Sequence, residues 1–325
     1  MTYRWRRQVT HVRYQTGTLW INIGAKTTHI FVRLAKVPVC GQDFLLARMF
    51  AERVSMSTHE VEGAGLCYDW IDLTPPWLTA RETVVFHHGV GASLDIWAEW
   101  LPALVNRYRV LRFDMRGHGR SAWRQAAAKL TMEALTDDLF AVMDAAGVQR
   151  AHLVGESIGG TIALSAALRS PDRVATLTVS NGAHVGVTIQ SVQDWQEIIG
   201  TRGMAGWSAH MMPLRFFAGS IPEGLARWFE ANQARAQPQA VLEMLEALVG
   251  TDTMDRLSGL KPPVLLLHPD SSPFIPVPLM ADFQARVPDG RLHVIGHARH
   301  GLPVSHARVC AELLRGFLAE HPAVE

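Results

Sequence analysis

The segment Gly155-Glu156-Ser157-Ile158-Gly159-Gly160 decides the fold of this chain. It follows a short apolar run at residues 151–154 and opens onto a second apolar run at residues 161–168. This order predicts a strand, a tight turn and a helix, with the serine at the apex of the turn. Glycines at both ends let the helix pass close to the strand and help the backbone to adopt a strained turn.

The pattern G-x-S-x-G between a strand and a helix is typical of a nucleophile elbow. In that arrangement the hydroxyl of Ser157 points out of the sheet, at the positive end of the following helix. A glycine-rich turn whose serine only caps the helix fits the same residues. The motif by itself leaves both interpretations open, so the rest of the chain has to decide between them.

The bulk composition is that of a globular protein with a large core. The chain has 325 residues, of which 48% are hydrophobic and 19% charged, enough for one large α/β domain or two small ones. A net charge of +1 indicates neither a nucleic-acid partner nor a membrane surface, and no apolar run is as long as a membrane span. Three widely spaced cysteines indicate a reducing compartment, so we expect a cytoplasmic protein.

The first 55 residues differ from the remainder in charge. They hold nine lysines and arginines but only two acidic residues, Asp43 and Glu52. Such a start is compatible with a transit peptide or a nucleic-acid-binding arm. We interpret residues 1–55 instead as a basic N-terminal extension that is dispensable for folding and activity.

Strand and helix patterns alternate from about residue 58 onward. A hairpin is predicted over residues 59–72, and a long helical insertion over residues 185–258. Further strands are predicted at 83–88, 108–113, 173–179, 263–268 and 291–295, and further helices at 94–105, 131–146, 277–287 and 307–319. Alternation of this kind predicts a largely parallel sheet with helices on both faces. Its active site is expected at the carboxyl ends of the strands, where residues 88–91, Ser157, Asp270 and His300 all fall.

Four motifs, in this order along the chain, resemble the α/β-hydrolase superfamily over about residues 58–320. They are His88-Gly89-Val90-Gly91, the segment Phe113-Asp114-Met115-Arg116-Gly117-His118-Gly119-Arg120-Ser121, the elbow, and Ala298-Arg299-His300. The resemblance implies a mostly parallel eight-stranded sheet with helices on both faces. It also implies a core of residues 56–184 and 259–325, with a helical cap, residues 185–258, inserted after the sixth strand.

The chemistry of these residues fits nucleophilic catalysis. A serine hydroxyl needs a base to remove its proton, and the resemblance places His300 in that role for Ser157. The backbone N–H groups of Val90 and Ile158 are expected to bind the negative oxygen of a tetrahedral intermediate. His297 is the nearest rival base. Three further residues are interpreted as organisers of their loop: Asp114, Arg116 and His118.

The acid of the expected triad is where the chain departs from the family pattern. Counting back from Pro276, the usual aspartate position holds Ser272, and Asp270 lies two residues earlier. A serine can accept a hydrogen bond from an imidazole, but it cannot stabilise the imidazolium by charge. We therefore expect Asp270 to be the acid. An acid function supplied near Asn181, or a serine–histidine dyad without an acid, are the alternatives.

The helical insertion contributes aromatic and methionine side chains. Four of them are predicted to line an apolar substrate pocket: Trp195, Trp207, Met211 and Trp228. Each of them also fits simple packing of the cap on the core. Among small hydrolases, the length of the cap and the placement of Trp228-Phe229 resemble those of enol-lactone hydrolases and carboxylesterases.

The function expected from these residues is that of a serine hydrolase, which cleaves a carboxylic ester or lactone through an acyl-enzyme. We expect a small-molecule substrate, no cofactor, no metal, no nucleic-acid or membrane partner, and a monomer or homodimer. Carbon–carbon bond hydrolases of ring-cleavage products share the serine. The ones we compare usually have an asparagine before it and an aromatic after the histidine, where this chain has Glu156 and Gly301. A hydrolase-fold protein that binds a ligand without turnover is a further alternative.

Overall fold

The structure is a computed structural model that describes residues 9–15, 18–25, 28–34, 55–123 and 129–323. The chain forms two compact units, Met1–Arg53 and Val54–Glu325. The first contains a three-stranded antiparallel sheet in the order β1-β2-β3, where the sequence predicts only a basic extension. Its strands are β1 (Val9–Gln15), β2 (Thr18–Ala25) and β3 (Thr28–Leu34).

The second unit is built on an eight-stranded sheet in the order β11-β10-β9-β8-β6-β7-β5-β4. The six strands from β6 to β11 run parallel to one another. Only β5 runs in the opposite direction, because it pairs antiparallel with both β4 and β7. The strands are β4 (Ser55–Val61), β5 (Leu66–Asp72), β6 (Thr83–His87), β7 (Arg109–Phe113), β8 (Ala151–Glu156), β9 (Val174–Ser180), β10 (Val264–Pro269) and β11 (Gly290–Ile295). This confirms the predicted fold class.

The central strands are buried on both faces, as parallel sheets require. Every residue of β8, β9 and β10 is buried. Successive residues alternate between two separate hydrophobic clusters, so that Val85 packs into one cluster while Val84 and Phe86 pack into the other. The apolar run of each strand therefore supplies both cores, and each core needs its own layer of helices.

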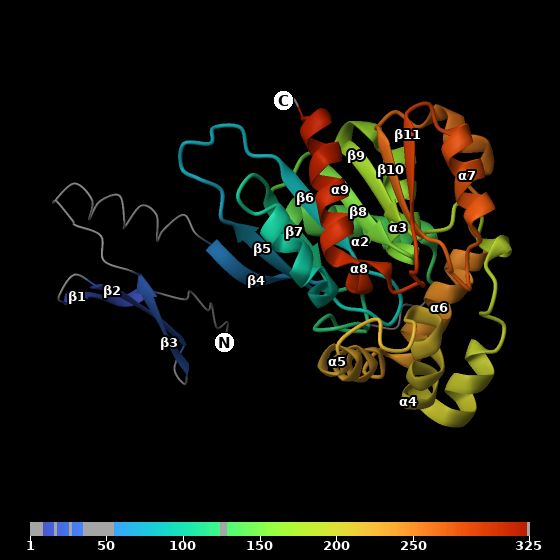
Figure 1. Cartoon of the computed structure of the whole chain (residues 1–325), viewed down its shortest axis with the longest axis horizontal. Coiled ribbons are helices and arrows are strands. Elements are labelled where there is room, and N and C mark those ends of the chain that lie inside the picture. The colour runs from blue at the N-terminus through green and yellow to red at the C-terminus, as the bar shows by residue number, and fades with distance from the viewer. Residues whose placement is uncertain (1–8, 16–17, 26–27, 35–54, 124–128, 324–325) are drawn as a thin grey trace. The chain divides into compact units, whose positions relative to one another are not determined.

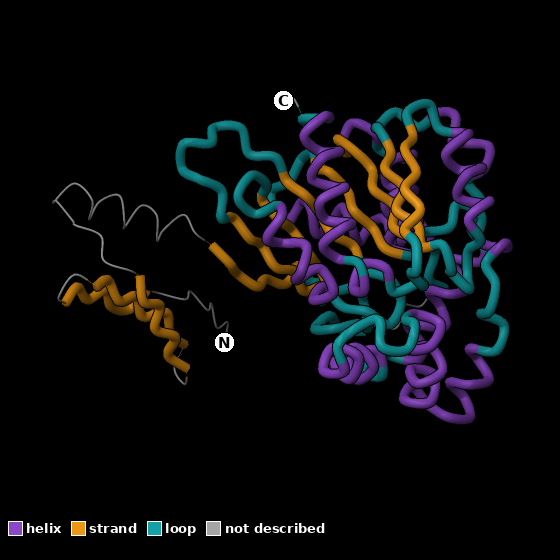
Figure 2. The backbone as a smooth tube through the Cα atoms, viewed as in Figure 1, coloured by secondary structure: helices purple, strands orange, loops and turns teal. Residues whose placement is uncertain are grey.

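Helices cover both faces of the sheet (Figures 1 and 2). One cluster is completed by α2 (Met132–Ala145), α3 (Ile158–Arg169) and α7 (Val277–Arg286). The other is completed by η1 (Leu94–Ala103), α8 (Leu302–Ser305) and α9 (Ala307–Glu320). The helix predicted at 94–105 is a 3-10 helix in the structure. Its last turn contains Pro102, which has no backbone N–H to donate. Three short 3-10 turns complete the set: η2 (Pro171–Arg173), η3 (Gly186–Thr188) and η4 (Met254–Gly259).

Three helices lie between β9 and β10 in the chain and gather at one end of the sheet (Figure 1). They are α4 (Trp195–Arg215), α5 (Glu223–Gln233) and α6 (Pro238–Val249), and we refer to them as the cap. Helix α4 is interrupted at Gly203, which has a φ of 65°. The kink divides α4 into two segments, and the second segment ends at Arg215.

Candidate active site

Ser157 stands at the turn between β8 and α3 in a strained conformation, with φ 55° and ψ −125°. Neighbouring glycines make room for this turn. A Cβ added to Gly155 would lie 2.2 Å from the carbonyl oxygen of Gly159, and one added to Gly159 would lie 2.5 Å from that of His87. Since side chains cannot be accommodated at such distances from backbone, the glycines are required for the elbow. A strained non-glycine residue held in this way is frequent at functional sites.

His300 meets Ser157 from the loop that follows β11. Its Nε2 lies 3.1 Å from the serine Oγ. The imidazole is buried, and the ring of Phe274 packs against it edge-on with centroids 4.6 Å apart. Burial, with Arg215 and His268 as lesser causes, holds the pKa of His300 well below its ordinary value of 6.5. The ring is therefore neutral at pH 7, as a general base must be.

The other ring nitrogen of His300 faces two uncharged side chains. Nδ1 lies 3.3 Å from Nδ2 of Asn181 and 3.4 Å from Oγ of Ser272. The amide of Asn181 is oriented by a second bond, in which Nδ2 donates to the carbonyl oxygen of His300 at 2.8 Å. Within the described residues, no carboxylate forms an ion pair or a hydrogen bond with either ring nitrogen. The base therefore has a hydrogen-bonding environment without the usual negative charge.

Asp270 does not reach His300, contrary to the expectation from the sequence. Its carboxylate accepts the backbone N–H groups of His297 at 2.8 Å and Ala298 at 3.1 Å, and the residue is exposed. Slight burial opposes ionisation, but these two amides lower the pKa of the carboxyl. Asp270 thus fixes the turn that leads to His300 rather than the imidazole itself. His297, the rival base, stacks on Phe217 at a centroid distance of 4.8 Å.

The loop after β6 lies directly against the nucleophile. A Cβ on Gly89 would be 2.8 Å from the Cβ of Ser157, and Gly91 adopts a φ of +76° beside Gln233 and Trp207. Val90, between the two glycines, lines the same small cavity as Ser157 and His300. This placement brings the Val90 backbone close to the elbow, as an oxyanion donor requires.

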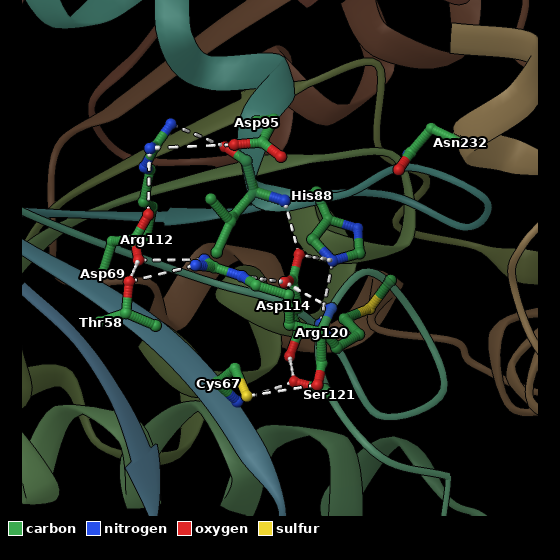
Figure 3. A network of polar contacts seen from close by, with 12 residues as sticks. Thr58, Cys67, Asp69, His88, Asp95, Arg112, Asp114, Arg120, Ser121 and Asn232 are labelled. Atoms are coloured by element: carbon green, nitrogen blue, oxygen red, sulfur yellow. Dashed lines mark hydrogen bonds and ion pairs between the residues drawn. The ribbon is translucent and has the colours of Figure 1, made fainter. Parts of the chain in front are cut away.

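A buried polar network contacts the residues on either side of this loop (Figure 3). Asp114 accepts the backbone N–H groups of Leu94 at 2.8 Å and Arg120 at 2.9 Å, while Nε2 of His88 accepts the N–H of Met115 at 2.9 Å. Asp69 extends the network through its ion pairs with Arg112 and Arg120, both 3.0 Å.

The other members of the Phe113–Ser121 motif make similar contacts. Arg116 pairs with Asp138 on α2, and Nδ1 of His118 lies 3.1 Å from the carbonyl oxygen of Arg116. These contacts, within the loop and from the loop to α2, fit the expected role of Asp114, Arg116 and His118 as loop organisers.

The cavity at Ser157 has a volume of about 30 Å³ and is mostly apolar. Besides Ser157, its polar lining comes from two residues, Arg215 and His300. Two of the four side chains predicted to line the pocket, Trp195 and Met211, do so. Trp207 is instead fully buried beside Gly91 and Trp195, and Trp228 borders a different cavity of about 280 Å³ that also contains Asp95 and Glu99.

Arg215 is a site residue that the sequence does not reveal. It comes from the last turn of α4 and is only 3% exposed. Its guanidinium nitrogens bind Oε1 of Gln233 at 2.7 Å, the carbonyl oxygen of Val90 at 2.5 Å and, as an ion pair at 3.6 Å, Glu156. The sequence does indicate that a cation is needed, because Glu156 lies inside a buried elbow, but it does not indicate which residue supplies the cation.

Glu156 completes this pair beside the nucleophile. It is 2% exposed, and a Cβ on Gly89 would meet its Oε2 at 2.1 Å. Burial raises the pKa of Glu156, whereas Arg215 opposes that change. Conversely, burial lowers the pKa of Arg215 and Glu156 opposes it. The two buried charges thus stabilise each other, and the backbone of Gly89 and the amide of Asn181 also favour the charged form of Glu156.

The described residues contain no group of three or more histidines, cysteines, aspartates or glutamates that could hold a metal ion. A search of the same residues finds no helix with the length and apolar character needed to cross a membrane.

Comparison with protein families and solved structures agrees with this fold. Residues 82–239 match the family model of the alpha/beta hydrolase fold. A protein of Caulobacter sp. (strain K31), whose name assigns it a carbamate hydrolase activity (RutD), is 30% identical over 257 residues, which cover 75% of this chain and 92% of that protein. The 2-hydroxymuconate semialdehyde hydrolase of Pseudomonas sp. (strain CF600) is 30% identical over 258 residues, 73% of this chain and 86% of that protein.

Among solved structures, the enol-lactonase from Burkholderia xenovorans LB400 superposes with a TM-score of 0.72. The two chains are 24% identical, and the match covers 81% of this chain and all of the enol-lactonase. At that identity the likeness shows a shared fold.

Proposed function

Because the chain belongs to the alpha/beta hydrolase family, we propose that it is a serine hydrolase that cleaves a carboxylic ester or lactone through an acyl-enzyme. The observation that carries this proposal is the 3.1 Å contact between Nε2 of His300 and Oγ of Ser157. A hydroxyl in contact with a neutral, buried imidazole can be deprotonated as it attacks a carbonyl carbon.

The remaining parts of the site support the same reaction. As Ser157 attacks, its proton passes to His300 and the carbonyl oxygen becomes negative. The N–H groups of Val90 and Ile158 are the proposed donors to that oxygen. His300 then protonates the leaving alcohol, and a water molecule, deprotonated by the same imidazole, hydrolyses the ester of Ser157.

The names of the relatives widen the range of acyl substrates to be tested. One relative is named as a carbamate hydrolase, one as a semialdehyde hydrolase and one solved structure as an enol-lactonase. The apolar chamber favours an ester or lactone with a small apolar acyl group, because polar groups without partners lose hydration there. A carbon–carbon bond hydrolase remains the alternative reaction that uses the same serine.

Ligand binding without turnover is a second candidate, and the lack of a carboxylate at Nδ1 of His300 favours it. The two candidates predict different behaviour with a fluorophosphonate, which reacts covalently with an activated serine. Wild-type protein should be labelled at Ser157, while the Ser157→Ala and His300→Ala variants should not be. Folded wild-type protein that resists labelling would refute the hydrolase.

The labelling experiment then leads to a substrate panel. We expect turnover of p-nitrophenyl esters with short acyl chains and of simple lactones, at rates above those for an aryl carbamate or a ring-cleavage product. A higher kcat/KM for the carbamate or for the carbon–carbon bond substrate would replace the ester assignment. Ser157→Ala is the control in each case, because it lacks the nucleophile, and its melting temperature checks that it is folded.

A further inference from the structure

The buried pair of Arg215 and Glu156 has consequences for the kind of acyl group that the chamber accepts. An arginine that lines an apolar active-site cavity is, at first sight, a receptor for an anionic substrate. Whether it can act as one depends on its free donors and on its neighbouring charge.

Every nitrogen of the Arg215 guanidinium already faces a protein group. Nε donates to Gln233, Nη2 donates to the carbonyl oxygen of Val90, and Nη1 faces Oε1 of Glu156. The guanidinium also lies over the ring of Phe229, 5.4 Å from its centroid. Each of the three nitrogens therefore has a protein partner, and the group is held in one orientation.

The charge of Arg215 is also compensated. Glu156 is the carboxylate paired with it at 3.6 Å, and both side chains are almost completely buried. Buried charges interact strongly because water does not screen them. A substrate carboxylate that approached Arg215 would have to lose its hydration and would meet the like charge of Glu156, which is fixed next to the nucleophile in the chain.

We propose that Glu156 is a specificity-determining residue that neutralises Arg215, so that the site selects substrates with an uncharged acyl group. This inference rests on the proposed serine hydrolase activity and names its substrate class. Arg215 then serves as a positioning residue. It links the cap to the Val90 loop, and its own carbonyl oxygen accepts the N–H of Gly301, next to His300, at 2.9 Å.

Two esters of nearly equal size and different charge test the proposal. p-Nitrophenyl butyrate has an uncharged acyl chain, whereas the mono-p-nitrophenyl ester of succinic acid ends in a carboxylate. We expect wild-type enzyme to have the higher kcat/KM for the butyrate. A wild-type preference for the succinate ester would overturn the proposal, because Arg215 would then be acting as an anion receptor.

The Glu156→Gln variant tests the role of the carboxylate itself. It keeps the shape of the side chain, removes the negative charge and leaves Arg215 uncompensated. The ratio of kcat/KM for the succinate ester to that for the butyrate should rise about tenfold or more, as expected for one unscreened charge interaction. Glu197→Gln, on the exposed surface of α4, is the matched control and should leave the ratio within about twofold of wild type.

The double variant Glu156→Gln/Arg215→Met distinguishes charge from folding. Because it has neither charge, its ratio of kcat/KM for the succinate ester to that for the butyrate should return to about the wild-type value. Its melting temperature should be closer to that of wild type than the melting temperature of Arg215→Met alone. An unchanged ester ratio in Glu156→Gln would refute the role of Glu156. Absence of turnover and of Ser157 labelling in wild-type protein would instead refute the serine hydrolase, and the two failures are thereby distinguished.

Discussion

The Oγ of Ser272 lies 3.4 Å from Nδ1 of His300, at the ring nitrogen that Ser157 does not contact. The same Oγ accepts the backbone N–H groups of Phe274 and Ile275, each at 3.3 Å. An aspartate at this position could accept hydrogen bonds from both backbone N–H groups and from Nδ1 of the imidazole. The loop of Ser272 therefore has the geometry of an acid site but not its charge.

The Ser272→Asp variant should increase kcat. His300 must carry its proton on Nδ1 to act as a base through Nε2, and Asn181 presents a donor to Nδ1 rather than an acceptor. A carboxylate at position 272 would stabilise both this tautomer and the imidazolium. Loss of such an acid costs about 10⁴-fold in kcat in a serine protease, so a gain on the order of 10²-fold is expected from steady-state hydrolysis of a p-nitrophenyl ester.

Ser272→Asn is the matched control for that gain, because it is similar in shape and uncharged. It should leave kcat at or below the wild-type value. The charge should also raise the pKa of His300, and the acid limb of the pH–rate profile should move to higher pH in Ser272→Asp. Equal activity in the aspartate and asparagine variants would show that charge at Nδ1 does not limit the reaction.

Replacement of Asp270 by alanine should affect stability more than catalysis. The carboxylate binds two amides of the turn at residues 297–298, and it does not contact the imidazole. We expect a fall of about 2–4 °C in the melting temperature, with the rate of ester hydrolysis within about threefold of wild type. A variant that folds normally but hydrolyses the ester about a hundredfold more slowly would return Asp270 to the role of the acid.

The stability of the folded protein should fall as the pH decreases below 6.5. Burial lowers the pKa of His87, His118 and His268 to about 4, and it holds those of His88 and His300 well below 6.5. The unfolded chain therefore binds more protons than the folded protein in this range. Each such histidine contributes a loss of up to about 1.4 kcal/mol per pH unit.

Urea unfolding at pH 7, 6 and 5 measures this dependence. The His118→Gln variant should have a shallower slope than wild type, since it removes one group that titrates only in the unfolded chain. A wild-type stability that does not change between pH 7 and pH 5 would contradict the burial of these histidines.

The sequence predicts the parts of the site that depend on short-range pattern. The elbow of Ser157 and the loop of Val90 need glycines at fixed spacing, because other atoms of the protein lie within contact distance there. These requirements produce short motifs that can be recognised in the sequence. The place of His300 after the last strand follows from the order of the motifs in the same way.

The acid and the buried cation could not be predicted, because both depend on distances across the fold. Asp270 and Ser272 are two residues apart, and only the turn of the loop decides which one faces His300. Arg215 lies far from Glu156 in the chain, in a helix that gives no sign of which residue enters the site. The three-stranded sheet of β1 to β3 was also not predicted, because the basic composition of that region suggested only an extension.

Removal of residues 1–53 should leave the activity and the melting temperature of the hydrolase unit nearly unchanged. The eight-stranded sheet begins at Ser55, and its residues form a compact unit from Val54 onward. Differential scanning calorimetry and ester hydrolysis of the shortened chain check this expectation. A fall in the melting temperature of more than about 5 °C would show that the first unit stabilises the second.

Substitution of Gly301 by alanine should reduce both stability and activity. A Cβ at this position would lie 2.2 Å from Cε1 of Phe216 and 2.9 Å from the carbonyl oxygen of Arg215. The cap thus occupies the space beside His300 that a side chain at 301 would need. We expect a loss of at least about 2 kcal/mol in the free energy of unfolding, because the core is overpacked.

The double variant Gly301→Ala/Phe216→Ala separates the ring contact from the backbone contact. Removal of the ring should recover part of the lost kcat relative to Gly301→Ala, and the clash with the Arg215 carbonyl should keep the recovery incomplete. Phe216→Ala alone measures the cost of the cavity left by the ring. Additive effects of the two substitutions on kcat would show that the cap does not constrain the position of His300 through this contact.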